Sequence, residues 1–168
     1  MAKFKAEDPK NLSATYGASR WSLFAGDQLK VADLLAVHKA RGDWDVVVDD
    51  GGHTMLMQIN TLRTLLPKVV PGGLYALEDF HTSHLDWTVK DGPGGVLARG
   101  YFIALTHELH VPGAMAQLSG NEAVMYEGVA QLAPLIKSID CTPQCCTLTR
   151  WLPEERAFEE TGVWKGGA

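Results

Sequence analysis

Three consecutive valines flanked by aspartates, in the segment DVVVDD at residues 45–50, limit what this chain can fold into. An unbroken apolar run shows none of the polar alternation of a half-exposed strand, so it predicts a strand buried on both faces. The segment 54–73 then carries apolar residues at helical spacing before prolines and glycines end it. A second apolar run, LYALED at residues 74–79, follows. Strand, helix and strand in this order predict a parallel βαβ unit.

The remaining segments extend this α/β pattern. Residues 22–27 predict a short strand that ends in Gly-Asp, and residues 31–42 predict a helix closed by a glycine. Further helices are expected over residues 96–110 and 122–135. Residues 136–153 predict an antiparallel strand pair at a sheet edge, with its turn at a Thr-Pro pair.

Composition and charge exclude several kinds of protein. The 168 residues are enough for one domain with a core. A net charge of -5 without any basic cluster argues against a nucleic-acid partner. No apolar run reaches the roughly 18 residues of a membrane span, and the first residues lack the apolar segment of a secretion signal. We therefore expect a cytoplasmic protein with no nucleic-acid or membrane partner.

Three cysteines lie late in the chain, at Cys141, Cys145 and Cys146. Their number and spacing do not match the four ligands of a structural zinc site. We expect them to be reduced, half-buried strand residues.

Adjacent carboxylates end both central strands, each pair followed by a histidine. Ligands bind beyond the carboxyl ends of parallel strands, and neighbouring strands lie about 4.8 Å apart. Asp50, Glu78 and Asp79 could therefore share one site. Three carboxylates would repel one another unless a cation such as Mg²⁺ lay between them. The alternative for Asp50 is a role in a turn or helix cap.

His53 follows Asp50 by three residues, at the start of the predicted helix. Histidine exchanges a proton near neutral pH, so His53 is a candidate general base. The two glycines between these residues would let the backbone turn and present both side chains to one site. The alternative for His53 is a helix cap or a surface position. His81 and His84 are expected to contact substrate or lie on the surface.

The string FAGDQ…DWDVVVDDGGHTMLMQINTLRTLLPKVVPGGLYALEDFHTS resembles the metal-dependent class I S-adenosylmethionine methyltransferases of the macrocin and mycinamicin sugar O-methyltransferase type. Cephalosporin hydroxylase-like proteins are a related branch. The paired patterns D-D-G-[SG]-H and E-D-x-x-T carry the resemblance, which is dense over residues 24–84 and thinner afterwards. It implies a partial Rossmann-like, mostly parallel sheet flanked by helices, with the antiparallel strand pair at the end. Residues 1–152 would form this partial methyltransferase domain, and residues 153–168 a tail that frays.

The resemblance also implies roles for single residues. Asp50, Glu78 and Asp79 match the Mg²⁺ ligands, His53 matches the catalytic base, and Asp27 and Gln28 match the positions that contact the adenine of S-adenosylmethionine. The implied reaction is Mg²⁺-assisted methyl transfer from S-adenosylmethionine to a hydroxyl of a small molecule, of the sugar or natural-product type. Vicinal substrate hydroxyls would chelate the metal, His53 would take the proton, and the oxygen would attack the sulfonium methyl. The sequence does not identify the acceptor, whose specificity would lie around residues 84–96.

One part of the family pattern, a glycine-rich turn that approaches the methionine portion of the cofactor, is not found. Only Gly17 precedes residue 22, so we expect the chain to lack the first βα unit and to bind S-adenosylmethionine poorly. The strand at residues 46–48 would then have an exposed edge, filled by residues 22–25 or by another copy of the chain in a homo-oligomer.

Two other functions stay open. The chain could be a catalytically inactive methyltransferase-like domain that serves binding or assembly. It could also be a different metal enzyme, although the spacing fits a site of two histidines and one carboxylate badly.

Overall fold

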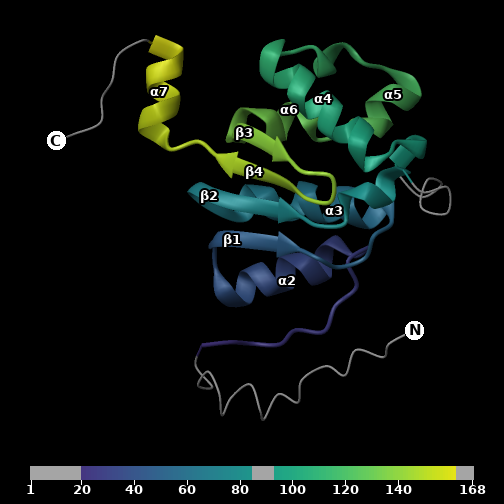
Figure 1. The fold of residues 1–168 in the computed structure, drawn as a ribbon, viewed down its shortest axis with the longest axis vertical. Helices are drawn as coiled ribbons and strands as arrows, with labels where there is room; N and C mark the ends of the chain where they lie inside the picture. Colours follow the sequence, from purple (N-terminus) through teal and green to yellow (C-terminus); the bar gives the residue numbers. More distant parts are fainter. Residues whose placement is uncertain (1–19, 85–92, 162–168) are drawn as a thin grey trace.

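The computed structural model of the chain describes residues 20–84 and 93–161. The loop expected to set specificity, residues 84–96, and the expected tail, residues 153–168, therefore lie partly outside the described residues. Figure 1 shows the strands side by side, with helices packed along them. In chain order the elements are α2 (Val31–Arg41), β1 (Trp44–Asp49), α3 (Met55–Leu65), β2 (Val69–Leu77), α4 (Ala98–His110), α5 (Gly120–Met125), α6 (Val129–Leu132), β3 (Ile136–Cys141), β4 (Cys146–Arg150) and α7 (Pro153–Thr161).

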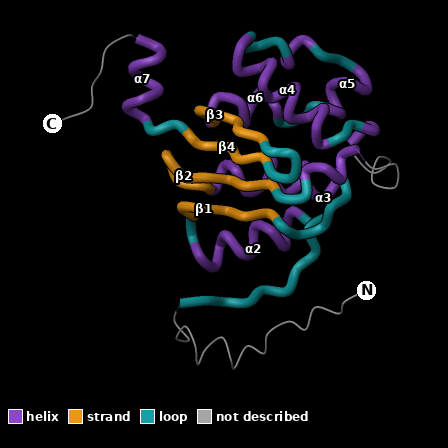
Figure 2. The backbone as a smooth tube through the Cα atoms, in the orientation of Figure 1, coloured by secondary structure: helices purple, strands orange, loops and turns teal. Residues whose placement is uncertain are grey.

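The four described strands form one mixed sheet in the order β1-β2-β4-β3. β1 and β2 run parallel, with Val47 opposite Tyr75 and Asp49 opposite Leu77. The other two pairings are antiparallel, and β4 lies between β2 and β3. The tube in Figure 2 follows α3 as it connects the two parallel strands. The expected α/β fold, its βαβ unit and its closing antiparallel pair are thus confirmed.

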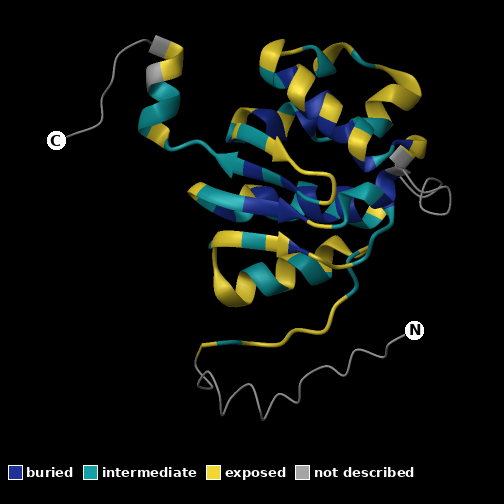
Figure 3. Ribbon diagram, viewed as in Figure 1, coloured by how far each residue is buried: buried dark blue, intermediate teal, exposed yellow. Residues whose placement is uncertain are grey.

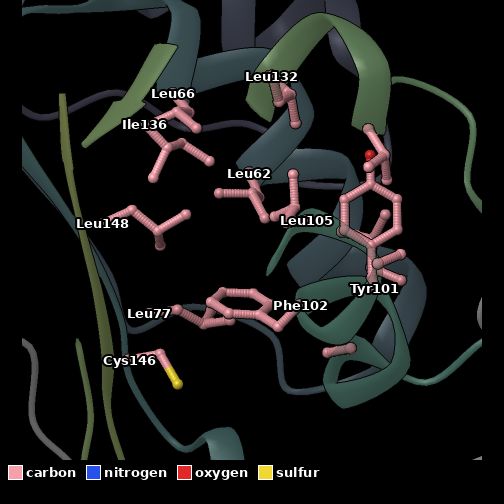
Figure 4. Packing of buried hydrophobic residues seen from close by; sticks show 14 of the residues in the cluster. Leu62, Leu66, Leu77, Tyr101, Phe102, Leu105, Leu132, Ile136, Cys146 and Leu148 are labelled. Atoms are coloured by element: carbon pink, nitrogen blue, oxygen red, sulfur yellow. The ribbon is translucent and has the colours of Figure 1, made fainter. Parts of the chain in front are cut away.

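The apolar core lies between the sheet and the helices α3, α4 and α6. Figure 4 shows its side chains meeting from both layers. Its labelled members are Leu62, Leu66, Leu77, Tyr101, Phe102, Leu105, Leu132, Ile136, Cys146 and Leu148. The predicted helical face of residues 54–73 is present only in part, because Ile59 is buried whereas Leu56 is 37% exposed. The helix ends at Leu65, and β2 already begins at Val69, ahead of the glycines.

Two expectations, one for residues 22–27 and one for β1, are wrong. Residues 22–27 form no strand. β1 is not buried on both faces: Val47 packs against the core, while Val46 and Val48 are 55% and 56% exposed on the opposite face. The reason is that α2 contacts α3 and α3 contacts α4, so these helices form one layer, and no described element covers the other face of β1. In Figure 3, much of β1 and α2 has the yellow colour of exposed residues.

Two expectations about helices in the second half also differ. The predicted helix over residues 122–135 is divided into α5 and α6, because Gly128 between them takes a left-handed φ of 87°. Residues 153–161 form α7 instead of a frayed tail. This helix is held by an ion pair between Glu155 and Lys137 and by a hydrogen bond from Arg156 to the carbonyl of Pro134.

The cysteines are not all reduced. Cys141 and Cys146 are opposite one another in the β3–β4 register and form a disulfide, while Cys145 is a free thiol. The spacing of a tight hairpin, which the sequence did not reveal, brings these two side chains together. Among the described residues, no helix has the length and apolarity needed to cross a membrane.

Candidate active site

The carboxyl ends of β1 and β2 meet at one end of the sheet, where the two acidic pairs lie. The last ladder hydrogen bond runs from the Glu78 amide to the Asp49 carbonyl, at 3.0 Å. Directly after it, Asp79 takes a left-handed φ of 49°, which is uncommon for a residue other than glycine. The amide and hydroxyl of Thr82 both donate to the Asp79 carbonyl, which fixes the turn that follows. The chain thereby leaves the strand abruptly and presents the Asp79 carboxylate beside the β1 loop, residues 50–54, which follows β1.

Three of the four residues proposed for metal and base chemistry come together in this place. One ligand atom each from Asp50, His53 and Asp79 lies within 4.8 Å of the others. The His53 Nε2 atom is 3.2 Å from the Asp79 carboxylate, and both side chains are about one-third exposed, at 33% and 39%. His53 directly precedes Thr54, which caps the amino end of α3 by accepting from the Met57 amide. The cluster is therefore open to solvent and lies at a helix end that favours negative charge.

Glu78, the fourth residue, is exposed and lies outside this cluster. The cause is the strand itself: Glu78 continues β2, and successive side chains on a strand point to opposite faces. Its charge instead acts on Cys145 of the neighbouring hairpin. Burial, and secondly Glu78, raise the pKa of the Cys145 thiol above its usual value.

A buried carboxylate, Asp49, lies beneath the exposed cluster. It is 6% exposed, and it accepts hydrogen bonds from the Tyr75 hydroxyl at 2.8 Å and from the Gln28 side-chain amide at 2.7 Å. Burial raises the pKa of Asp49, and these two hydrogen bonds oppose the rise. Burial and the nearby Asp49 charge raise the pKa of Tyr75 well above its usual value, so its hydroxyl stays a donor.

Gln28 contacts the same loop a second time. Its side-chain oxygen accepts from the Gly52 amide at 2.7 Å, and its backbone carbonyl accepts from the Asn60 side chain at 2.7 Å. A Cβ atom added at Gly51 would lie 2.7 Å from the Gln28 oxygen, and one at Gly52 would lie 2.1 Å from the Met57 sulfur. A side chain at either glycine would therefore displace the end of Gln28 or of Met57, a packing effect beyond the flexibility expected from the sequence.

Asp27, the other predicted cofactor residue, lies at the surface in the turn before α2. Its carboxylate accepts from the Leu29 amide at 3.0 Å and lies 3.5 Å from the Lys30 ammonium, with its side chain 41% exposed. Its amide donates to Asp33. The carboxylate is thus accessible to a donor such as an exocyclic amine.

Sequence reasoning missed Asp49, Tyr75 and the contact of His81 with the site. The Nδ1 atom of His81 lies 3.8 Å from the Asp79 carboxylate. Strand alternation could have identified Asp49, because it shares the inward face of Val47. The proximity of His81 depends on the left-handed backbone of Asp79, which no local sequence pattern indicates. The side chain of His84 lies outside the described residues.

Comparison with known proteins supports the resemblance found in the motifs. No protein-family model matches the chain. It is 41% identical over 66 residues to 8-demethyl-8-alpha-L-rhamnosyl tetracenomycin-C 2'-O-methyltransferase of Streptomyces olivaceus, covering 39% of this chain and 17% of that protein. It is 37% identical over 59 residues to mycinamicin VI 2''-O-methyltransferase of Micromonospora griseorubida, covering 35% of this chain and 15% of the relative. The chain thus matches less than a fifth of the length of these relatives.

The fold is also similar to solved structures. MycE methyltransferase from the mycinamycin biosynthetic pathway, in complex with Mg and SAH, superposes with a TM-score of 0.60 over 86% of this chain and 38% of that one, at 20% identity. A second MycE structure, with Mg, SAH and mycinamycin VI, gives a TM-score of 0.57. At this identity the likeness establishes the fold. By sequence, the matched part of the chain is similar to sugar O-methyltransferases of the tetracenomycin, mycinamicin and macrocin type.

Proposed function

We propose that this chain provides the metal and base chemistry of an S-adenosylmethionine-dependent O-methyltransferase that acts on a hydroxyl of a sugar or natural-product molecule. The observation that carries the proposal is the cluster of Asp50, His53 and Asp79 at the ends of two parallel strands. The relatives support it, since those described above are named as O-methyltransferases. Two MycE structures contain Mg and SAH.

The donor set of the cluster fits Mg²⁺. Asp50 and Asp79 offer carboxylate oxygens, the ligands that this ion prefers, and an exposed site leaves room for water and substrate oxygens. We propose these two carboxylates as ligands; Glu78, which the family resemblance implies as a further ligand, lies outside the cluster and would join them only if its side chain moves toward the ion. A bound Mg²⁺ would lower the pKa of a coordinated substrate hydroxyl.

His53 is proposed as the general base. Imidazole is a poor ligand for Mg²⁺ compared with carboxylate, so its nitrogen stays available for a proton. Its Nε2 atom lies 3.2 Å from the Asp79 carboxylate, within reach of donating a hydrogen bond to it. To act as the base, neutral Nε2 would release this contact as the Asp79 carboxylate turns to the metal. A hydroxyl held there can give its proton to Nε2 as the oxygen attacks the methyl group.

Asp27 and Gln28 are proposed to contact the adenine of the cofactor. The accessible Asp27 carboxylate can accept from an exocyclic amine, and the Gln28 backbone N–H can reach a ring nitrogen. The remaining expectations also stay part of this proposal: a methyltransferase domain over residues 1–152 followed by a tail, and a cytoplasmic location.

A second candidate function is a methyltransferase-like domain without activity that serves binding or assembly. The observation that favours it is the weak covering of the β1 side: α2 has no buried residue, and Val46 and Val48 are more than half exposed. A second copy of the chain could cover this surface and form a homo-oligomer.

The test is methyl transfer from S-adenosylmethionine to a rhamnosylated acceptor in the presence of Mg²⁺, followed by mass spectrometry. His53→Ala is expected to lower the rate about 100-fold or more while metal affinity, measured by calorimetry, is retained. Equal turnover by both proteins would contradict the role of His53. Metal binding without any turnover by the wild-type chain would favour the second candidate function.

A further inference from the structure

The side chain of Gln28 has no role in the chemistry proposed above, yet it connects the two loops of the site. It comes from the turn before α2 and contacts the β1 loop at two points, Asp49 and Gly52. These two contacts lie on either side of Asp50, the proposed metal ligand. Its own backbone carbonyl is held by Asn60 of α3. Gln28 is therefore fixed at both of its ends.

Three separate observations indicate that the loop is shaped around this side chain. The amide donates to a carboxylate that is 6% exposed. The oxygen accepts from a backbone N–H at 2.7 Å. A side chain at Gly51 would collide with the same oxygen at 2.7 Å. Few apolar contacts compensate on this side of the sheet, because α2 has no buried residue.

We propose that Gln28 is a positioning residue, which holds the Asp50–His53 loop through Asp49 and Gly52 in the geometry that binds a divalent cation. Tyr75 completes the arrangement by donating to the second oxygen of Asp49. Partners of this kind, one step removed from a metal, typically change metal affinity 10- to 100-fold when replaced. This inference rests on the proposed function, because the cation site is that of the methyltransferase chemistry.

The proposal can be tested by exchanging the donor and the acceptor of the hydrogen bond between Gln28 and Asp49. Gln28→Glu replaces the donor that faces Asp49 by a second carboxylate, whereas Gln28→Glu combined with Asp49→Asn reverses donor and acceptor. The reversed pair keeps the net charge and leaves acceptors for Gly52 and Tyr75. The probe is Mn²⁺, which carboxylate ligands bind much as they bind Mg²⁺, with free Mn²⁺ counted by electron paramagnetic resonance.

Gln28→Glu is expected to weaken Mn²⁺ binding about tenfold, and the double variant to recover most of the loss. Glu108→Ala serves as the control, because Glu108 is a buried carboxylate that accepts from Gly113 and Met115 at the far end of α4. It should lower stability without changing Mn²⁺ affinity. An unchanged affinity in Gln28→Glu, or a double variant that binds no better than the single one, would overturn the proposal. Gln28→Ala, which adds no charge, replaces the single variant if that one does not fold.

A second measurement separates this inference from the proposed function. If the wild-type chain binds no Mn²⁺, the metal site itself is wrong, but the role of Gln28 can still be read from the Gly52 amide. Its hydrogen exchange, followed by nuclear magnetic resonance without metal, should be at least about tenfold faster in Gln28→Ala because its acceptor is lost. The core amide of Leu105 should not change. Equal Gly52 exchange in both proteins would overturn the inference.

Discussion

Two parts of the sheet differ in how they are stabilised: the β2–β4 side, which comprises β2, β4 and the helices packed on them, and the β1 side, which comprises β1 and α2. On the β2–β4 side, Tyr75, Leu105 and Leu148 are fully buried among α3, α4 and the strands. On the β1 side, α2 has no buried residue and Val46 and Val48 are more than half exposed. The candidate site straddles this boundary, since Asp79 follows β2 whereas Asp50 and His53 follow β1. Apolar packing therefore fixes one half of the site, and polar contacts such as those of Gln28 fix the other.

The largest expected effect tests this difference in packing directly. Leu105→Ala removes a fully buried side chain and should lower the free energy of unfolding by about 2–5 kcal/mol. Leu35→Ala on α2, where the side chain is 40% exposed, should cost less than about 1 kcal/mol. Urea unfolding followed by circular dichroism measures both. Similar losses for the two variants would mean that the β1 side contributes as much to stability as the β2–β4 side.

The next effect compares the two acidic residues that follow β2. Asp79 lies in the cluster and Glu78 does not, so Asp79→Asn should weaken Mn²⁺ binding about 10- to 100-fold, equivalent to about 1.4–2.8 kcal/mol. Glu78→Gln should change it about threefold or less. Titration of each variant with Mn²⁺ gives the affinities. An equal loss in both variants would show that Glu78 joins the ligands when metal binds, as the family resemblance implies.

Local pattern was enough to predict the βαβ unit and the residues that end it. Asp50, His53 and Asp79 could be found because parallel strands bring their carboxyl ends to one edge, and this edge is fixed by topology alone. The position of Glu78 could not be predicted, since it depends on where β2 gives way to the left-handed turn at Asp79. The exact residue at which the strand gives way to the turn decides which of the two carboxylates faces the cluster.

The rest depended on contacts between distant segments. An unbroken run of valines is buried on both faces of a strand only if other elements cover both faces. The described helices α2, α3 and α4 form a single layer, so they cover only one face of β1. The disulfide between Cys141 and Cys146 required the hairpin register. The side-chain contacts of Gln28 join residues separated by 21 and 24 positions in the chain, and no local pattern reveals such a pairing.

A smaller effect is expected from the exposed β1 surface. If a second copy covers it, Val48→Lys should weaken self-association about tenfold, or about 1.4 kcal/mol, because a charge would be buried in the interface. Ile103→Lys is the matched control, since this side chain is 69% exposed on α4. Sedimentation velocity over a range of concentrations separates the two. A wild-type chain that stays monomeric throughout would exclude the homo-oligomer at these concentrations.

The smallest expected effect tests whether the Glu78 side chain lies near Cys145. Burial is the main cause that raises the pKa of the Cys145 thiol, and the Glu78 charge is the second. Glu78→Gln removes only the second cause, so the pKa of Cys145 should fall slightly and its alkylation by iodoacetamide at pH 8 should become faster, because the thiolate is the reacting form. Glu122→Gln, at an exposed position on α5, should leave the rate unchanged.

Adding Mg²⁺ to the wild-type chain turns the same measurement into a test of the fourth ligand. If Glu78 moves into the cluster when metal binds, its charge moves away from Cys145 and is neutralised by the ion. Alkylation should then accelerate, as it does in Glu78→Gln. If Asp50 and Asp79 hold the ion without it, only the charge of the ion itself acts on the thiol, so Mg²⁺ should change the alkylation rate equally in the wild-type chain and in Glu78→Gln. The free thiol of the well-packed side would thus report whether metal binding draws a residue across the boundary between the two sides of the sheet.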